Sequence, residues 1–447
     1  MAAQVHPVDA PLPEIVNQAA LLVARERAKS IVLRAWILSG LFFMALPGTL
    51  LGFSNLMAIS AHHGLGSMPA AWVEGHGHAQ VFGWIGSFIL GIGFYSQPSR
   101  GRSLVRVPIT CFALWTMGVA LRWFANIYLW HWQMLLPLSA AMETLAVLLF
   151  LSAASHHKLP ESGQRRAMEP WMASVLLGTL GLTAAVVFNF IECLRLSISG
   201  ITPAFPRAID QKYLLLLGWG FIVLAVWGFS ARWLPSFLAL ARPRPGALYL
   251  ALVMLVTGVL AGTGDLMKLA VLLLAASSLI ILRALRLAEP PHGQAKTNGI
   301  HPSFPIWVRL SYLWLVVAGS MSVVASFADL HGGIWGASRH ALTVGFAATM
   351  VFAIGPRILP HFAGVEAIFS RQIMFLSLLL LQAGCTLRVT SEPLAYEGVL
   401  SSAWKTLPIS GMLELSGVLL FALNLALTMV AKSLPLRSQS AAPHSRQ

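Results

Sequence analysis

Two stretches of this sequence share a histidine-led pattern that could bind a metal. His78 and His340 each precede an alanine, and a glycine follows five residues after each histidine, at Gly83 and Gly345. In both stretches a second glycine comes ten residues later and a proline five residues beyond that. Neutral imidazole is the commonest metal ligand among side chains. A weaker third copy starts at Tyr213 but has no histidine. The shared spacing predicts two helices that carry their histidines at matching positions.

The composition shows what must position these histidines. The chain is 57% hydrophobic and 10% charged, against roughly 25% charged residues in a soluble domain. A membrane-spanning helix needs about 20 apolar residues. The sequence predicts an all-α polytopic bundle of about twelve transmembrane helices. They are expected at roughly 31–58, 78–97, 106–129, 133–154, 170–191, 213–234, 246–263, 265–284, 309–327, 340–358, 369–389 and 408–430. The two histidine-led copies lie either side of the long polar link 288–305, as an internal duplication would leave them.

The charges predict the topology. The net charge of +14 does not indicate nucleic-acid binding, because the basic residues lie in short loops between apolar spans. Basic residues before the first span place the N-terminus in the cytoplasm. We expect a cytoplasmic segment at 1–30, a transmembrane domain at 31–432 with a cytoplasmic loop at 288–305, and a disordered tail at 433–447. Few basic residues then fall on the opposite side: Arg195, Arg207, Lys212, Arg339, Arg388 and Lys405. Both termini are predicted to be cytoplasmic.

This topology places His78 and His340 at similar depth near the outer face, since both helices run inward. Haem held between two helices needs a neutral imidazole on each side of the iron, and small residues such as Gly83 and Gly345 would make room for the macrocycle. Its propionates need cations, and Arg339 and Arg122 lie on the same side.

Each of these residues also has a structural interpretation. A lone histidine at a span end is commonly an interfacial hydrogen-bonding residue, and glycines are common wherever helices meet in a membrane. Arg122 could form a structural ion pair, for example with Glu143, and Glu143 could instead carry protons. The three cysteines have no CxxC spacing, and the sequence contains neither a P-loop nor a nucleophile elbow.

Three segments carry a resemblance to a known family: EGHGHAQVFGWIGSFILGIGF in the second span, GWGFIVLAVWGFSARWLP in the sixth, and RHALTVGFAATMVFAIGPRILPHFAG in the tenth. SEPLAYEG, further on, is similar too. The chain resembles the NnrS family of haem- and copper-containing membrane proteins. The resemblance implies a b-type haem, leaves copper open, and implies a role in nitric oxide handling or in a response linked to denitrification, at the bacterial inner membrane.

A more distant likeness is to haem-copper oxidase subunit I, which holds a low-spin haem between histidines on spans two and ten. Carried over by position, this likeness implies His78 and His340 as metal ligands, with His76 as a competitor on the second span. The oxidases hold copper with histidines on spans six and seven, and here those spans have none. A catalytic haem-copper pair is therefore not expected. Copper would need outer histidines, such as His76, His62, His63 or His331, or methionine sulfurs.

Two further functions stay open. Twelve spans with an apparent repeat also fit a secondary transporter, although no pair of broken helices with mid-membrane charges is evident. A non-catalytic assembly or sensing partner of a respiratory complex would keep haem without turnover. The expected partners are the lipid bilayer, haem and nitric oxide. No sequence feature predicts a protein partner.

Overall fold

The computed structural model describes residues 13–96, 103–155 and 168–431, and these residues form helices and no strand. Within these ranges, twelve helices are long and apolar enough to cross a membrane, which confirms the predicted all-α polytopic bundle. The predicted tail at 433–447 and the start of the N-terminal segment lie outside the described residues. Successive spans are α1 (Pro13–Phe43) with η1 (Met44–Leu50) and α2 (Leu51–His62); α3 (Ala70–His78) with η3 (Ala79–Gly86) and α4 (Ser87–Ser96); α5 (Ser103–Tyr128); α6 (Trp132–Ser155); α7 (Pro170–Ser199); α8 (Arg207–Leu215) with η4 (Leu216–Val223) and α9 (Leu224–Leu238); α10 (Pro245–Thr263); α11 (Met267–Ala284); α12 (Phe304–Ala328); α13 (Gly333–His340) with η5 (Ala341–Ala348) and α14 (Thr349–Phe362); α15 (Arg371–Tyr396); and α16 (Ala403–Val430).

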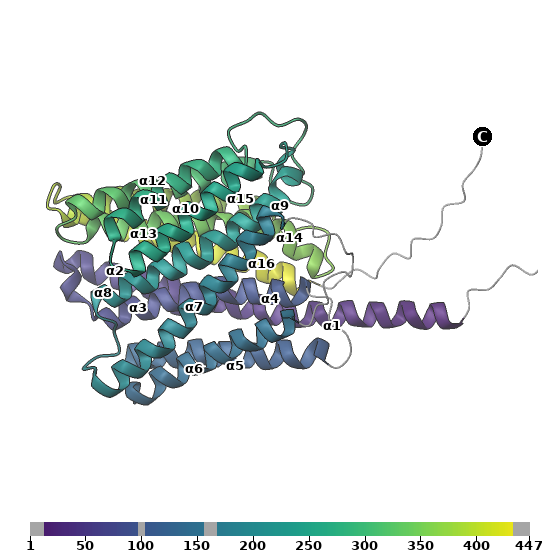
Figure 1. Cartoon of the computed structure of the whole chain (residues 1–447), viewed down its shortest axis with the longest axis horizontal. Coiled ribbons are helices and arrows are strands. Elements are labelled where there is room, and N and C mark those ends of the chain that lie inside the picture. Colours follow the sequence, from purple (N-terminus) through teal and green to yellow (C-terminus); the bar gives the residue numbers. More distant parts are fainter. Residues whose placement is uncertain (1–12, 97–102, 156–167, 432–447) are drawn as a thin grey trace, which may run out of the picture.

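The spans form a closed ring in chain order. Each span packs against the next one, and α16 packs against α2 and η1 of the first span. Figure 1 shows the helices lying side by side along one direction, with α1 starting at one end of the bundle. We call this end the terminal end, and the opposite end, which carries α2, α3 and α8, the far end. Span two packs against span one, and span ten contacts span twelve. Because spans one and twelve also pack against each other, spans two and ten come near one another although they are distant in sequence.

Four spans contain a π-helical segment: η1, η3, η4 and η5. η3 begins directly after His78, and η5 begins directly after His340. The matching sequence copies therefore have matching backbone geometry. Segments of π-helix inside α-helices are often found at functional sites.

Small residues let the ring close tightly. A Cβ added at Gly181 of α7 would overlap the backbone carbonyl of Gly220 in η4, so the two helix backbones are in contact there. Close approach through glycine is common between helices in membranes. The largest fully buried side chains are aromatic, such as Trp36, Trp115 and Trp227. Close backbone contact at glycine and large buried aromatic side chains together pack the spans against one another.

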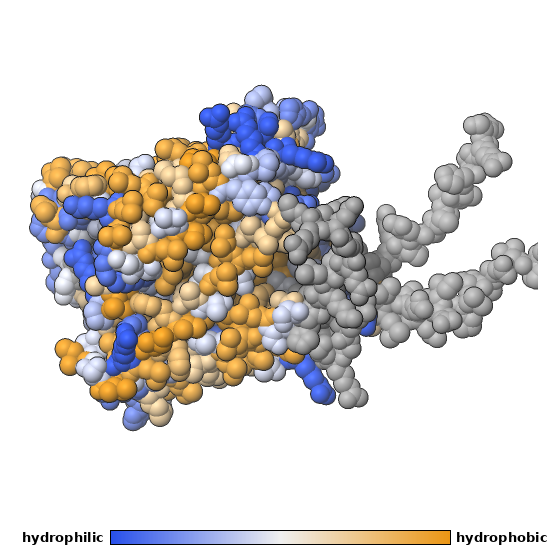
Figure 2. Space-filling model, in the orientation of Figure 1, coloured by the Kyte–Doolittle hydropathy of each residue, from blue (hydrophilic) through white to orange (hydrophobic). Residues whose placement is uncertain are grey.

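The outer surface matches a membrane environment. Figure 2 shows a broad hydrophobic band along the helices, with hydrophilic residues gathered over the loop between α11 and α12. This loop covers the end of α9, where the Lys296 amide donates to the Phe237 carbonyl and the His292 amide to the Ala239 carbonyl, both at 2.8 Å. The predicted 288–305 link is therefore a folded loop that packs against the bundle.

Candidate functional site

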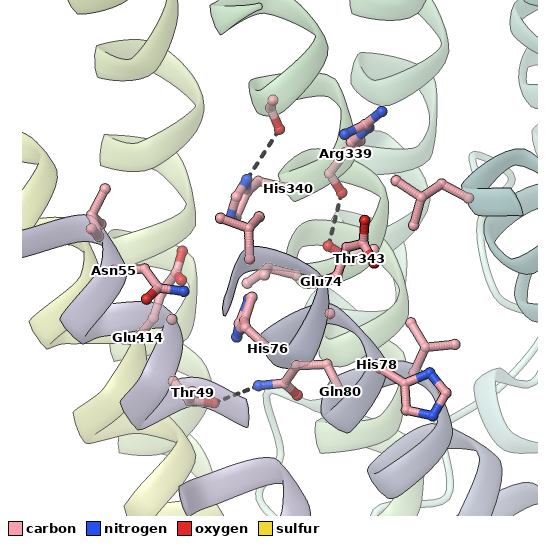
Figure 3. Close-up of a pocket in the computed structure, with 18 of the residues that line it drawn as sticks. Thr49, Asn55, Glu74, His76, His78, Gln80, Arg339, His340, Thr343 and Glu414 are labelled. Atoms are coloured by element: carbon pink, nitrogen blue, oxygen red, sulfur yellow. Dashed lines mark hydrogen bonds between the residues drawn. The ribbon is translucent and has the colours of Figure 1, made fainter. Parts of the chain in front are cut away.

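A cavity of about 350 Å³ lies between the spans toward the far end of the bundle. Its lining residues come from spans one, two, three, six, ten, eleven and twelve. The volume falls within the usual range of ligand pockets, about 300–1,000 Å³. Figure 3 shows His76 and His340 projecting into this space from two different helices.

The imidazole of His76 is held by the first span. Its Nδ1 lies 2.8 Å from the carbonyl oxygen of Gly48. Because a carbonyl only accepts, Nδ1 carries the proton and Nε2 keeps a free lone pair. The ring rests on Gly52, where an added Cβ would lie 2.5 Å from Cε1 and 2.6 Å from Nδ1. Glycine at this position is therefore what allows the ring to lie there.

His340 is held in the same way from its own helix. Its Nδ1 lies 3.0 Å from the Gly336 carbonyl oxygen, so the same reasoning leaves Nε2 free. A carboxylate oxygen of Glu392 on α15 lies 3.6 Å from the same Nδ1. Both His76 and His340 thus line one cavity with an unprotonated Nε2, the form of imidazole that ligates a metal.

His78 lines the cavity but has a different partner. Its Nε2 lies 2.7 Å from Oε1 of Glu143, which is fully buried. Its ring stacks on Phe82 with centroids 4.4 Å apart. Figure 3 shows the ring turned away from the space between His76 and His340. The structure therefore brings His340 together with His76, the competitor on the second span, rather than with His78.

The predicted cations line the cavity with partners of their own. Arg122 is buried and donates from Nη1 to Cys193 Sγ at 2.8 Å and from Nη2 to Glu74 at 3.4 Å. Arg339 lies 3.7 Å from Asp210, and its side chain is 40% exposed. Arg122 therefore belongs to a buried polar network, and only Arg339 combines an exposed guanidinium with the cavity.

That network continues toward His78. Nη1 of Arg122 donates to the Asn189 side-chain oxygen at 3.3 Å. The side-chain Nδ2 of Asn189 donates to Glu143 at the same distance. Arg122 therefore does not form the ion pair with Glu143 that the sequence suggested: Asn189 lies between them, and the carboxylate that Arg122 pairs with is Glu74. Glu74, which the sequence reasoning missed, accepts a 2.6 Å hydrogen bond from the Phe205 amide.

Gly83 and Gly345 pack against neighbouring spans. A Cβ at Gly83 would lie 2.6 Å from Phe43, and one at Gly345 would lie 2.5 Å from Trp314. Neither glycine lines the cavity. The room that these residues create is occupied by aromatic side chains of spans one and nine.

Sequence reasoning missed a charged group on α15 and α16. Arg388 and Glu392 form a buried ion pair, with Nε 3.1 Å from a carboxylate oxygen. Nη1 of Arg388 and Oε1 of Glu414 are buried and have no hydrogen-bond partner among the described residues. All three residues line the cavity. The four-residue spacing of Arg388 and Glu392 could have indicated an ion pair on one helical face. It was missed because the eleventh span was expected to end at 389, whereas α15 continues to Tyr396.

The described residues contain no group of three or more His, Cys, Asp or Glu side chains that could hold a metal ion. The outer histidines proposed for copper have separate neighbours. His62 bonds its own helix, His63 stacks on Trp404, and His331 lies 3.2 Å from Glu397. Copper stays a prediction from the resemblance.

The fold and the cavity define a polytopic α-helical membrane protein with ionisable groups enclosed between its spans. The chain belongs to the family described as a domain of unknown function, DUF8744, which matches residues 207–431. The match includes His340, Arg388, Glu392 and Glu414 but not His76. No curated protein matches the chain.

Proposed function

We propose that this chain is a haem-binding integral membrane protein in which His76 and His340 hold the iron. The observation that carries the proposal is the pair of imidazoles that line one cavity. Each ring is oriented by a backbone carbonyl at Nδ1, and each has a free Nε2. Ligating histidines commonly donate their other ring nitrogen in this way, which fixes the tautomer and the ring orientation.

The other lining residues fit the demands of haem. A haem needs an apolar enclosure for the macrocycle and cationic partners for two propionates. Val81, Ile85, Leu217 and Val344 supply apolar walls. Arg388 has a buried Nη1 without a hydrogen-bond partner, and buried polar atoms of this kind usually have one in the functional state. Arg388 and Arg339 are therefore the cations that would hold the propionates.

When bound, haem would supply one-electron redox chemistry, and a diatomic ligand such as nitric oxide would bind if one of the two histidines left the iron. The chain contributes the orientation of His76 and His340 and the exclusion of bulk water by the ring of spans. Its resemblance to the NnrS family supports a role in handling nitric oxide or responding to it. The proposal includes a bacterial inner-membrane location with both termini cytoplasmic, which the concentration of basic residues on that side supports.

The test is a visible absorption spectrum of the detergent-purified full chain, oxidised and then reduced with dithionite, before and after nitric oxide addition. We expect sharp reduced bands of a low-spin b-type haem in the wild type. His76→Ala and His340→Ala should each lose these bands. His78→Ala should keep them, and His331→Ala, which changes an exposed histidine of the far end, serves as the matched control. Loss in His78→Ala with retention in His76→Ala would reverse the assignment on the second span.

A colourless preparation from haem-replete cells would refute haem binding. Arg388, Glu392 and Glu414, which line the cavity, would then favour the secondary transporter, because ionisable residues within a membrane commonly mark a substrate or ion pathway. A haem spectrum that is insensitive to nitric oxide would favour electron transfer or a sensing partner of a respiratory complex.

A further inference from the structure

The two histidines differ in what faces their protonated nitrogen. Nδ1 of His76 meets the Gly48 carbonyl at 2.8 Å. Nδ1 of His340 meets the Gly336 carbonyl at 3.0 Å and a carboxylate oxygen of Glu392 at 3.6 Å. The Glu392 side chain is only 5% exposed, so water screens this interaction weakly.

The Glu392 carboxylate is fixed on both sides. Arg388 approaches its two oxygens through Nε at 3.1 Å and Nη2 at 3.3 Å. On the other side lies Gly336, where any added Cβ would overlap the carboxylate. The residue whose carbonyl orients His340 is therefore also the residue whose missing side chain admits Glu392.

We propose that Glu392 is a positioning residue for His340 and makes it the more electron-donating of the two iron ligands. This inference rests on the proposed haem function. A carboxylate near the Nδ1–H of a ligating imidazole raises the basicity of Nε2. At 3.6 Å Glu392 acts through its charge, because the hydrogen bond of Nδ1 goes to the Gly336 carbonyl. Stronger donation and nearby negative charge both favour ferric over ferrous iron. Glu392 therefore lowers the reduction potential of the site.

The experiment is a redox titration of purified haem-loaded full-length protein, followed by absorption. Glu392→Gln should keep the haem and its low-spin bands while the midpoint potential rises. Outer-shell partners of metal ligands typically contribute 10–100-fold. A tenfold change in the ferric-to-ferrous affinity ratio equals about 59 mV for a one-electron couple. We expect a rise of at least that size.

Glu414→Gln is the matched control, because Glu414 is another acid that lines the cavity but forms no hydrogen bond or ion pair with His340 among the described residues. An equal rise in Glu414→Gln would show a general charge effect and overturn the role of Glu392. So would a Glu392→Gln protein that binds haem at the wild-type potential. If Glu392→Gln does not fold, Glu392→Asp is tested in its place. Its shorter side chain moves the carboxylate away from His340 and should raise the midpoint potential by a smaller amount. A midpoint potential at or below that of the wild type would overturn the inference. A wild type without haem would refute the proposed function itself.

Discussion

Gly52 offers the sharpest test of how His76 is held. A Cβ at this position would lie 2.5 Å from Cε1 of the imidazole, whereas ordinary contact begins at 3.4 Å. In Gly52→Ala the ring must therefore move by about 0.9 Å (3.4 − 2.5). Gly48 and Gly52 are four residues apart on one helical face, so moving the ring away from residue 52 also moves it away from the Gly48 carbonyl.

A shift of this size would lengthen the orienting hydrogen bond. The distance from Nδ1 to the Gly48 oxygen is 2.8 Å and would grow to at most about 3.7 Å (2.8 + 0.9), where it is no longer a hydrogen bond. Losing the partner of a ligating imidazole typically lowers metal affinity by about 10–100-fold. Alanine also favours the helix by roughly 0.5–1 kcal/mol over glycine. The variant should therefore lose haem without losing fold stability.

The assay compares the haem-to-protein ratio, the reduced spectrum and the thermal unfolding midpoint of wild type and Gly52→Ala. Gly246→Ala is the matched control, because it also adds a Cβ in a helix but meets no atom within 4 Å. If Gly52→Ala kept the haem content and spectrum of the wild type, His76 would not be the ligand. His78, whose partner is Glu143, does not depend on Gly52.

Three further outcomes follow from the structure. Gly181→Ala adds a Cβ that overlaps the backbone of η4, so overpacking should destabilise the bundle by about 1–3 kcal/mol and lower its unfolding midpoint in a thermal melt in detergent. Arg388→Gln should lower haem content more than Arg339→Gln, because Arg388 is buried and Arg339 is 40% exposed; equal losses measured from absorbance would contradict this ranking. Burial acts to raise the pKa of Glu397, but hydrogen bonds from His331 outweigh it and hold the pKa below its ordinary value. The stability that this acid contributes is then present above about pH 4.5 and is lost as the pH falls further, so thermal melts of Glu397→Gln should lose that part of the acid dependence and match the wild type only at low pH.

The sequence predicted the bundle because lipid imposes a simple rule on composition. Backbone groups in a membrane must be satisfied internally, so long apolar runs become helices. The matched spacing of His78 and His340 corresponds to a shared backbone feature that the sequence did not predict, because a π-helical segment begins directly after each of them. Apolar runs and repeated spacings depend on residues close together in the sequence, so the sequence alone can predict them.

The sequence did not show which histidine of the second span lies near His340. His76 and His78 are two residues apart, and residues so spaced on a helix face different directions. Which of them lies toward His340 depends on the rotation of α3, which is set by packing against Gly52 and Glu143 from other spans. The eleventh span was expected to end at 389, directly after Arg388, whereas α15 continues to Tyr396 and places Arg388 within the helix.

The third copy of the repeat contributes a different polar group to the same cavity. Span six has its own π-helical segment, η4, and packs against η5 of span ten, but it carries Tyr213 where the other copies have histidine. Tyr213 lines the same cavity, with a buried hydroxyl that has no hydrogen-bond partner among the described residues. A phenol at this depth can donate a hydrogen bond, whereas neutral imidazole is the commoner metal ligand. The same backbone framework thus supplies two imidazoles and one hydroxyl to a single enclosed space, and the metal-binding capacity that we propose follows from side chains on spans two and ten, not from the repeat itself.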